Sequence, residues 1–255
     1  MESPMLLLNA AILIATGAVY AYVGLVTWRR RVGGEAQLAS DLFATFWLAL
    51  AATTAAGALP RIMAYLGVAD LALYATITHV NIFAICIALW GLLYYLLYLF
   101  TGKRGTLIPV SIFYVLFYAW LVYILAVRTP TGLEVDGWNV RLTYATEIQG
   151  PVITAFALLL ILPPVLGAAG YARLFFKVDD PTQRYRIGLV SFTILAWFGT
   201  ILLVFFLQVG SGVWWQIASR LIGLAAAYLI YAAYRPPAWV RTRWGIRRID
   251  EPAGA

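Results

Sequence analysis

The stretch WWQIASRLIGLAAAYLIYAAY, residues 214–234, is the last long apolar segment of the chain and contains one cation, Arg220. A helix needs about 20 predominantly apolar residues to cross the hydrocarbon core of a bilayer, and this segment is long enough. An ionisable side chain inside such a helix is costly and usually faces the interior of the protein. The stretch therefore predicts a membrane helix that packs in a bundle and carries a candidate functional residue.

The rest of the chain has the same apolar character. Hydrophobic residues make up 63% of the 255 residues and charged residues 11%, whereas a soluble domain has about 45–50% and about 25%. Further segments long enough to cross a membrane lie near 5–28, 41–66, 70–100, 107–127, 147–175 and 185–209, and the last extends over 212–234. The sequence predicts an all-α integral membrane protein, a seven-transmembrane helix bundle in a single domain over 1–234, followed by a basic tail at 235–255.

Basic residues gather on one side of this bundle, after the first, third, fifth and seventh predicted helices. They are Arg29, Arg30, Arg31, Lys103, Arg104, Arg173, Lys177, Arg184, Arg186, Arg235, Arg241, Arg243, Arg247 and Arg248. The loops on the opposite side hold Arg128 and Arg141. Because positive loops stay in the cytoplasm, we expect a multi-pass protein with its N-terminus outside and its C-terminus cytoplasmic, and a prokaryotic plasma membrane is favoured. The net charge of +7 indicates no nucleic-acid partner, since the basic residues lie in these short loops.

The long outer loop, about 128–146, contains LEVDGWNVRLTY at 133–144. Two alternating runs of β-favouring residues flank Asp136-Gly137, a dipeptide that strongly favours a hairpin turn. We expect a short extracellular β-hairpin between the fourth and fifth helices, lying over the mouth of the bundle. The alternative is a loop that only joins the two helix ends.

Two inner helix ends resemble each other. Tyr95-Leu-Leu-Tyr98 belongs to the third predicted helix and Tyr228-Leu-Ile-Tyr231 to the seventh. The first and fifth helices also share a run from small residues through tyrosine to a basic exit. A parallel repeat of three helices, one linker helix and three helices would explain both similarities.

This 3+1+3 count and this orientation resemble the architecture of microbial rhodopsins. In that family a lysine of the seventh helix holds retinal, but the lysines of this chain are Lys103 and Lys177, both in predicted cytoplasmic loops. The resemblance therefore does not extend to covalent retinal. No cofactor is predicted, although the aromatic spans are compatible with a bound lipid or carotenoid. The layout is also similar to that of small 3+1+3 sugar transporters, without their Pro-Gln pair.

Arg220 has two interpretations. With Gln216 one turn before it on the same helix face, it either forms a buried ion pair with Asp70 or Glu147, which would lock helices together, or anchors the carboxylate or phosphate of a ligand. The planar guanidinium suits both partners.

The other candidate ligand-binding residues lie mostly in the predicted outer half. They are Arg61, Asp70, His79, Asn81, Trp90, Glu147, Trp197 and Gln216. Arg61 follows a proline near a helix end, so we expect it to extend to the outer headgroups or, if it points inward, to join Arg220 in an electropositive mouth. His79 is the single histidine and Cys86 the single cysteine, so no metal site is predicted. The tryptophans pack in the core or line an apolar pocket.

No catalytic residues are predicted, because the spans contain no nucleophile–base pair and no cluster of carboxylates, and enzymatic activity is disfavoured. The favoured function is a receptor-like or sensory protein that binds a small or lipidic ligand, anionic or hydrophobic, in an outer-half pocket. The alternatives are a 3+1+3 transporter or channel and a structural membrane subunit. Expected partners are membrane lipids, the ligand and a separate cytoplasmic or membrane signalling protein, since the tail is too short to be an output domain. The oligomeric state is not predicted.

Overall fold

The computed structural model describes residues 4–29, 34–126, 128–145, 150–206 and 213–247. Within these ranges, the side chains of 34–36, 125–126, 150–163, 197–198, 200–206, 213 and 215–216 lie outside the description. Predictions that concern Glu147, or the side chains of Trp197 and Gln216, are therefore beyond what the structure describes.

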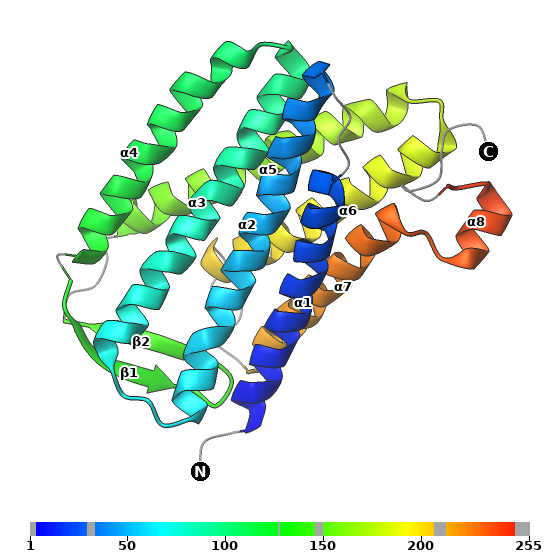
Figure 1. The fold of residues 1–255 in the computed structure, drawn as a ribbon. Helices are drawn as coiled ribbons and strands as arrows, with labels where there is room; N and C mark the ends of the chain where they lie inside the picture. Colours follow the sequence, from blue (N-terminus) through cyan, green and yellow to red (C-terminus); the bar gives the residue numbers. More distant parts are fainter. Residues whose placement is uncertain (1–3, 30–33, 127, 146–149, 207–212, 248–255) are drawn as a thin grey trace.

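Long helices dominate the described chain (Figure 1). They are α1 (Pro4–Arg29), α2 (Gly34–Tyr65), α3 (Leu71–Thr101), α4 (Leu107–Ala126), α5 (Gly150–Lys177), α6 (Pro181–Phe206) and α7 (Val213–Tyr234). A short 3₁₀ turn, η1 (Arg104–Thr106), precedes α4, and a short helix, α8 (Ala238–Trp244), follows α7. Helix α2 begins at Gly34, before the predicted span at 41–66, because polar residues extend the helix beyond its apolar part, where Gln37 donates a hydrogen bond to Asp41 at 2.6 Å.

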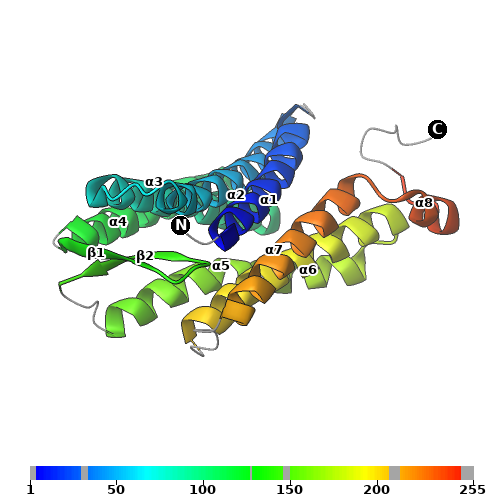
Figure 2. The same ribbon diagram turned by 90° about the horizontal axis from the view of Figure 1, so that it is seen from below.

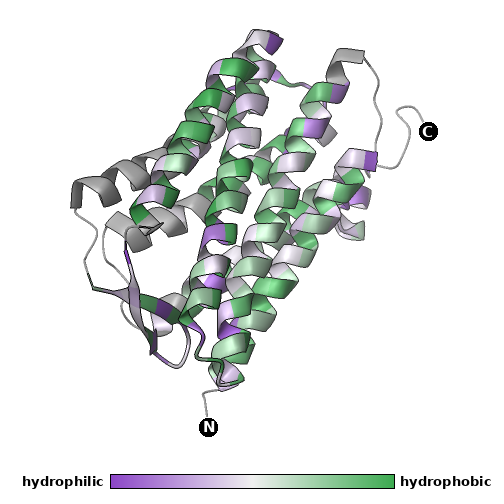
Figure 3. Cartoon of the chain, turned by 60° about the vertical axis from the view of Figure 1, so that its left-hand side comes forward, coloured by the Kyte–Doolittle hydropathy of each residue, from purple (hydrophilic) through white to green (hydrophobic). Residues whose placement is uncertain are grey.

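Five helical segments in the described ranges are long and apolar enough to cross a membrane. They are Pro4–Arg29, Gln37–Tyr65, Leu71–Thr101, Arg104–Ile124 and Ile217–Tyr234. Large apolar side chains such as Leu8, Ile112 and Leu116 are half exposed or more on their surfaces, as expected where lipid is the solvent. Hydrophobic residues cover much of the helices, and hydrophilic ones gather towards the two ends of the bundle (Figure 3). These features support an all-α, multi-pass membrane protein.

The helices form two groups of three. Helices α1, α2 and α3 pack in sequence, and so do α5, α6 and α7, which gives two layers (Figure 2). The groups meet where α1 contacts α7 and where α3 contacts α5, while α4 packs on α3. Helices α1 and α2 approach closely at Gly17 and Gly24, where a Cβ would come within 3 Å of Thr54 and Leu48. Small residues permit such approach between membrane helices.

A two-stranded antiparallel sheet connects α4 and α5. Strand β1 (Pro130–Val135) pairs with β2 (Val140–Tyr144), and Val135 lies opposite Val140. The loop between them is Asp136–Asn139, so the turn is longer than a two-residue Asp-Gly turn. Asp136 accepts hydrogen bonds from the backbone N–H groups of Trp138 and Asn139, and Gly137 adopts a φ of 81°, which glycine tolerates without strain.

The bundle has two different ends, named here for what they carry. The hairpin end holds β1, β2, the start of α1 and the α2–α3 connection (Figure 1). The basic end holds Arg29, the Lys103-Arg104 pair and Arg235, at the ends of α1, α3 and α7. An aromatic cluster of Tyr20, Phe43, Phe46, Trp47 and Tyr95 fills the core between α1, α2 and α3 towards the basic end.

Candidate functional site

The tip of the hairpin is inserted into the bundle. Trp138 is 1% exposed and belongs to the largest fully buried side chains. The side-chain amide of Asn9, on α1, is fully buried and donates a hydrogen bond to the carbonyl oxygen of Trp138 at 2.6 Å. The hairpin is therefore held to α1 by its turn rather than lying loosely over the helix ends.

Arg61 points into the bundle at the same place. It is 7% exposed, and its guanidinium donates hydrogen bonds to the carbonyl oxygen of Gly57 and to Oδ1 of Asn139 in the hairpin turn. The prediction that Arg61 extends to the headgroups is wrong, because the hairpin turn supplies a polar partner inside the bundle. The alternative prediction, that the side chain of Arg61 points inward, agrees with its observed position.

Arg220 lies near Arg61. It is half-buried on α7, and its positive charge acts unfavourably on that of Arg61, while the negative charge of Asp136 acts favourably on Arg61. The charge of Arg61 on α2 is thus affected by two other charges, that of Arg220 on α7 and that of Asp136 in the hairpin turn. Residues 61, 136 and 220 are far apart in sequence, and folding alone brings them together.

The predicted lock between Arg220 and Asp70 is absent. Asp70 is exposed and caps the start of α3, where its carboxylate accepts hydrogen bonds from the backbone N–H groups of Ala72 and Leu73 at 2.9 and 3.1 Å. An N-cap carboxylate compensates the unpaired N–H groups of a helix start. Among the carboxylates that the structure describes, none forms an ion pair with Arg220.

Several buried polar atoms around the hairpin turn have no hydrogen-bond partner. The donors are Nε of Arg61, Nε of Arg220 and Nε1 of Trp138, and the acceptor is Oδ1 of Asn9. Each unsatisfied buried group costs about 1–3 kcal/mol, and buried polar atoms in proteins normally have a partner in the protein, in water or in a ligand. These four residues, Asn9, Arg61, Trp138 and Arg220, together with Asp136 and Asn139 of the hairpin turn, are called the arginine site below.

The remaining predicted residues lie elsewhere on α3. His79 is half-buried, and its Nδ1 lies 2.7 Å from the carbonyl oxygen of Ala75, which requires the proton on Nδ1. Oδ1 of Asn81 is buried without a partner. Within the described ranges, no three His, Cys, Asp or Glu residues lie together as metal ligands would.

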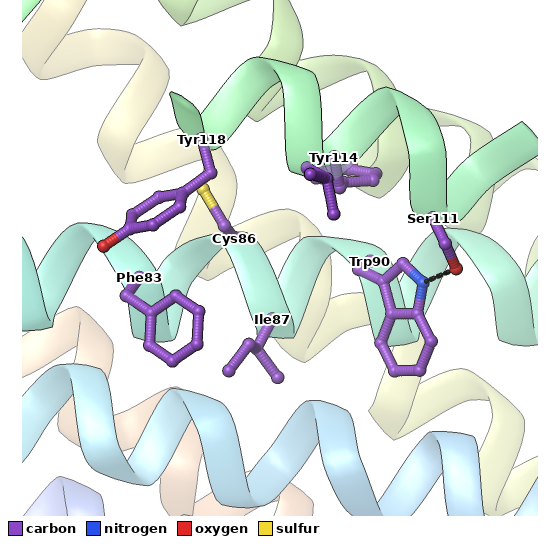
Figure 4. A pocket seen from close by; sticks show the side chains of 8 residues that line it. Phe83, Cys86, Ile87, Trp90, Ser111, Tyr114 and Tyr118 are labelled. Carbon is purple, nitrogen blue, oxygen red and sulfur yellow. Dashed lines mark hydrogen bonds between the residues drawn. The ribbon is translucent and has the colours of Figure 1, made fainter. Parts of the chain in front are cut away.

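Trp90 belongs to a groove between α3 and α4. Its Nε1 donates a hydrogen bond to the hydroxyl of Ser111 at 3.0 Å (Figure 4). The cavity measures about 270 Å³ and is lined by Phe83, Cys86, Ile87, Trp90, Ser111, Tyr114, Val115 and Tyr118. Trp90 thus lines an apolar pocket, as one interpretation of the sequence allowed, but this pocket lies on the α3–α4 side and contains none of the arginine site residues.

Sequence reasoning missed four residues of the arginine site: Asn9, Asp136, Trp138 and Asn139. Asn9 carried a usable signal, since it is a strongly polar residue within the first apolar span. The three loop residues carried none beyond the turn propensity of Asp136-Gly137, because only the tertiary fold buries Trp138 and brings Asn139 to Arg61.

The charges of the arginine site define what it can hold. The site carries the two positive charges of Arg61 and Arg220 and the negative charge of Asp136, which acts on Arg61. One further negative charge would therefore balance it, and guanidinium N–H groups are suited to oxygen acceptors. A carboxylate or phosphate has this chemistry.

No family model matches the chain, and no curated protein matches it.

Proposed function

We propose that this chain is a receptor-like or sensory membrane protein that binds the anionic group of a small or lipidic ligand between Arg61 and Arg220. In this proposal seven helices cross the membrane, the hairpin end faces outside and the basic end faces the cytoplasm, because the basic residues follow the positive-inside rule. One observation carries the proposal: the buried Arg61 is electrostatically coupled to the like charge of the half-buried Arg220, while Asp136 is a described carboxylate that acts on Arg61.

Electrostatics favours an anionic guest. Like charges in a partly buried environment repel each other, and the charge of Arg220 acts unfavourably on that of Arg61. A carboxylate or phosphate between Arg61 and Arg220 would reverse the sign of this interaction and accept hydrogen bonds from both planar guanidinium groups. The free protein therefore bears a cost that ligand binding removes.

The hairpin connects such binding to a structural change. Asn139 accepts a hydrogen bond from Arg61, so an anion that recruits the same guanidinium competes with the hairpin for it. Asn9 and Trp138 hold the turn independently of Arg61. Binding would thus shift the hairpin without releasing it, and the change would pass along α2 or α7 to a separate signalling partner.

Thermal unfolding of the detergent-solubilised full chain tests this proposal. Inorganic phosphate and octanoate are the anionic probes, and octanamide is the uncharged control. We expect at least one anion to raise the Tm of the wild type and to raise that of Arg220→Gln much less. Arg141→Gln, which removes an exposed arginine of β2, is the matched control and should keep the full shift. The proposal fails if neither anion stabilises the wild type, or if Arg220→Gln keeps the shift.

A second candidate, a 3+1+3 transporter, has its own supporting observation. The two contacts between the helix groups, α1 with α7 and α5 with α3, are equivalent under a parallel repeat. Each contact contains a tyrosine pair: the ring centroids of Tyr22 and Tyr231 are 5.7 Å apart, and those of Tyr95 and Tyr171 are 6.5 Å apart. Uptake of labelled phosphate into proteoliposomes, lost in Arg220→Gln, would favour transport over sensing.

A further inference from the structure

A second groove lies between α1 and α7. Its cavity measures about 610 Å³ and is lined by Val19, Leu221, Leu224, Ala225, Tyr228 and Tyr231. Leu221 and Tyr228 are 53% and 57% exposed, whereas Ala226, Ala227 and Ile230 on the other side of α7 are buried. The groove therefore opens on the outer surface of the bundle, where a membrane would surround it, and not into the interior.

The dimensions of the groove match one leaflet. From Leu221 to Tyr231, α7 rises about 15 Å at 1.5 Å per residue, which is half of the roughly 30 Å hydrocarbon core. The groove begins near the middle of α7 and ends close to the basic end, where the helix stops at Tyr234. An acyl chain of the leaflet at the basic end would lie along it.

The positively charged side chain of Arg235 lies at the end of this groove. Arg235 follows α7 directly, and its guanidinium carbon lies 5.4 Å from the ring centroid of Tyr22 on α1. The ring of Tyr22 in turn contacts that of Tyr231, which lines the groove. This cation–π contact keeps the exposed guanidinium beside the groove, and no described carboxylate forms an ion pair with it.

Helix α8 marks the level of the lipid headgroups. It follows Pro236-Pro237 and lies to one side of the end of α7 (Figure 1). Trp239 and Trp244 are 61% and 52% exposed, with ring centroids 5.8 Å apart. A short helix with exposed tryptophans and arginines is typical of the membrane interface, so Arg235, a few residues before α8, lies where lipid phosphates lie.

From these observations we infer that the α1–α7 groove binds an anionic phospholipid, with one acyl chain along α7 and the phosphate at Arg235. The α3–α4 groove offers an internal comparison. It is similarly apolar, but its lining contains the Trp90–Ser111 pair and no cation. Of the two grooves described here, the α1–α7 groove is the one that has both a length suited to an acyl chain and a positive charge at its end.

Native mass spectrometry of the full chain, titrated with equal amounts of phosphatidylglycerol and phosphatidylcholine carrying the same acyl chains, tests this site. The wild type should retain phosphatidylglycerol about fivefold better, as expected for one arginine–headgroup interaction. Arg235→Gln should remove this preference and leave retention of phosphatidylcholine unchanged. Ala225→Trp should fill the groove and lower retention of both lipids. Soluble glycerol 3-phosphate should bind much more weakly, since it lacks the acyl chains.

Two matched variants separate a specific site from general attraction. Arg243→Gln removes an exposed arginine of α8, and Val115→Trp fills the α3–α4 groove; both should keep the wild-type preference. Equal losses in Arg235→Gln and Arg243→Gln would overturn the inference, because the preference would then reflect only the net charge of the basic end. Unchanged lipid retention in a folded Ala225→Trp variant would overturn it as well. Arg220 and Arg235 lie 15 residues apart along and just beyond α7, so the result for Arg235→Gln leaves the proposed function untouched.

Discussion

The hairpin end and the basic end differ in how their buried polar groups are hydrogen-bonded. Buried polar groups meet at the hairpin end, and several of them lack partners. Towards the basic end, aromatic rings pack against one another, and the hydroxyl of Tyr94 donates to the carbonyl oxygen of Arg104 at 3.1 Å. Among the described residues, fewer buried polar atoms lack a hydrogen bond at this end, namely Nε1 of Trp47 and Nε of Arg186. Unsatisfied polar atoms cost stability, so the hairpin end gives up stability that the basic end retains. Such a cost is typical of sites that bind something.

The largest expected effect is on the hairpin anchor. Trp138→Ala removes a side chain that is 1% exposed, and truncations of buried tryptophan destabilise proteins by about 3–5 kcal/mol. Unfolding in mixed detergent, together with protease cleavage of the hairpin, measures the loss. Trp244→Ala, at an exposed position of α8, should change stability by less than about 0.5 kcal/mol. Similar losses in the two variants would show that the hairpin turn is not a structural anchor.

The stability of a variant at Arg220 tests whether the hairpin end contains a poorly compensated charge. Breaking a buried ion pair costs about 3–5 kcal/mol, whereas removing a partly buried charge that no described carboxylate pairs with also removes its desolvation cost. We expect Arg220→Met to unfold at a higher denaturant concentration than the wild type, by about 1–2 kcal/mol, because the repulsion on Arg61 disappears. A loss of 3 kcal/mol or more would mean that Arg220 is held by a carboxylate after all.

The sequence was informative where one physical rule decides the outcome. Hydropathy and length predicted long apolar helices, and turn chemistry predicted a hairpin at Asp136-Gly137, since both depend on local residues. Local residues did not predict the orientation of the Arg61 side chain correctly. Its position after Pro60 favoured an outward side chain, but Asn139, far along the chain, supplies the partner that turns it inward. Asp70 was misjudged for the opposite reason, because the nearby backbone N–H groups of α3 bind its carboxylate first.

A smaller effect is expected in the aromatic half. Tyr95 and Tyr171 are joined by a side-chain hydrogen bond, and a hydrogen bond contributes about 1 kcal/mol to stability. Tyr95→Phe should therefore lower the free energy of unfolding by about 1 kcal/mol, while the ring contact with Phe43, 5.1 Å between centroids, is kept. The same variant should leave the anion-dependent shift of Tm intact, since it lies away from the arginine site. A change in that shift would show that the two ends of the bundle are coupled.

The smallest effect concerns the hairpin at high pH. Burial raises the pKa of Tyr144, with the nearby cation of Arg128 acting in the opposite direction; the Arg128 guanidinium carbon lies 4.0 Å from the ring centroid. A folded-state pKa above the unfolded value of about 10 means that the folded state binds this proton more tightly. The stability from Tyr144 is thus fully present below pH 10 and is lost as the pH rises through its folded pKa. Protease cleavage of the hairpin should increase in this alkaline range for the wild type and less for Tyr144→Phe. If both respond alike, other groups control the alkaline opening, and Trp138 and Asn9 remain as the contacts that hold the hairpin.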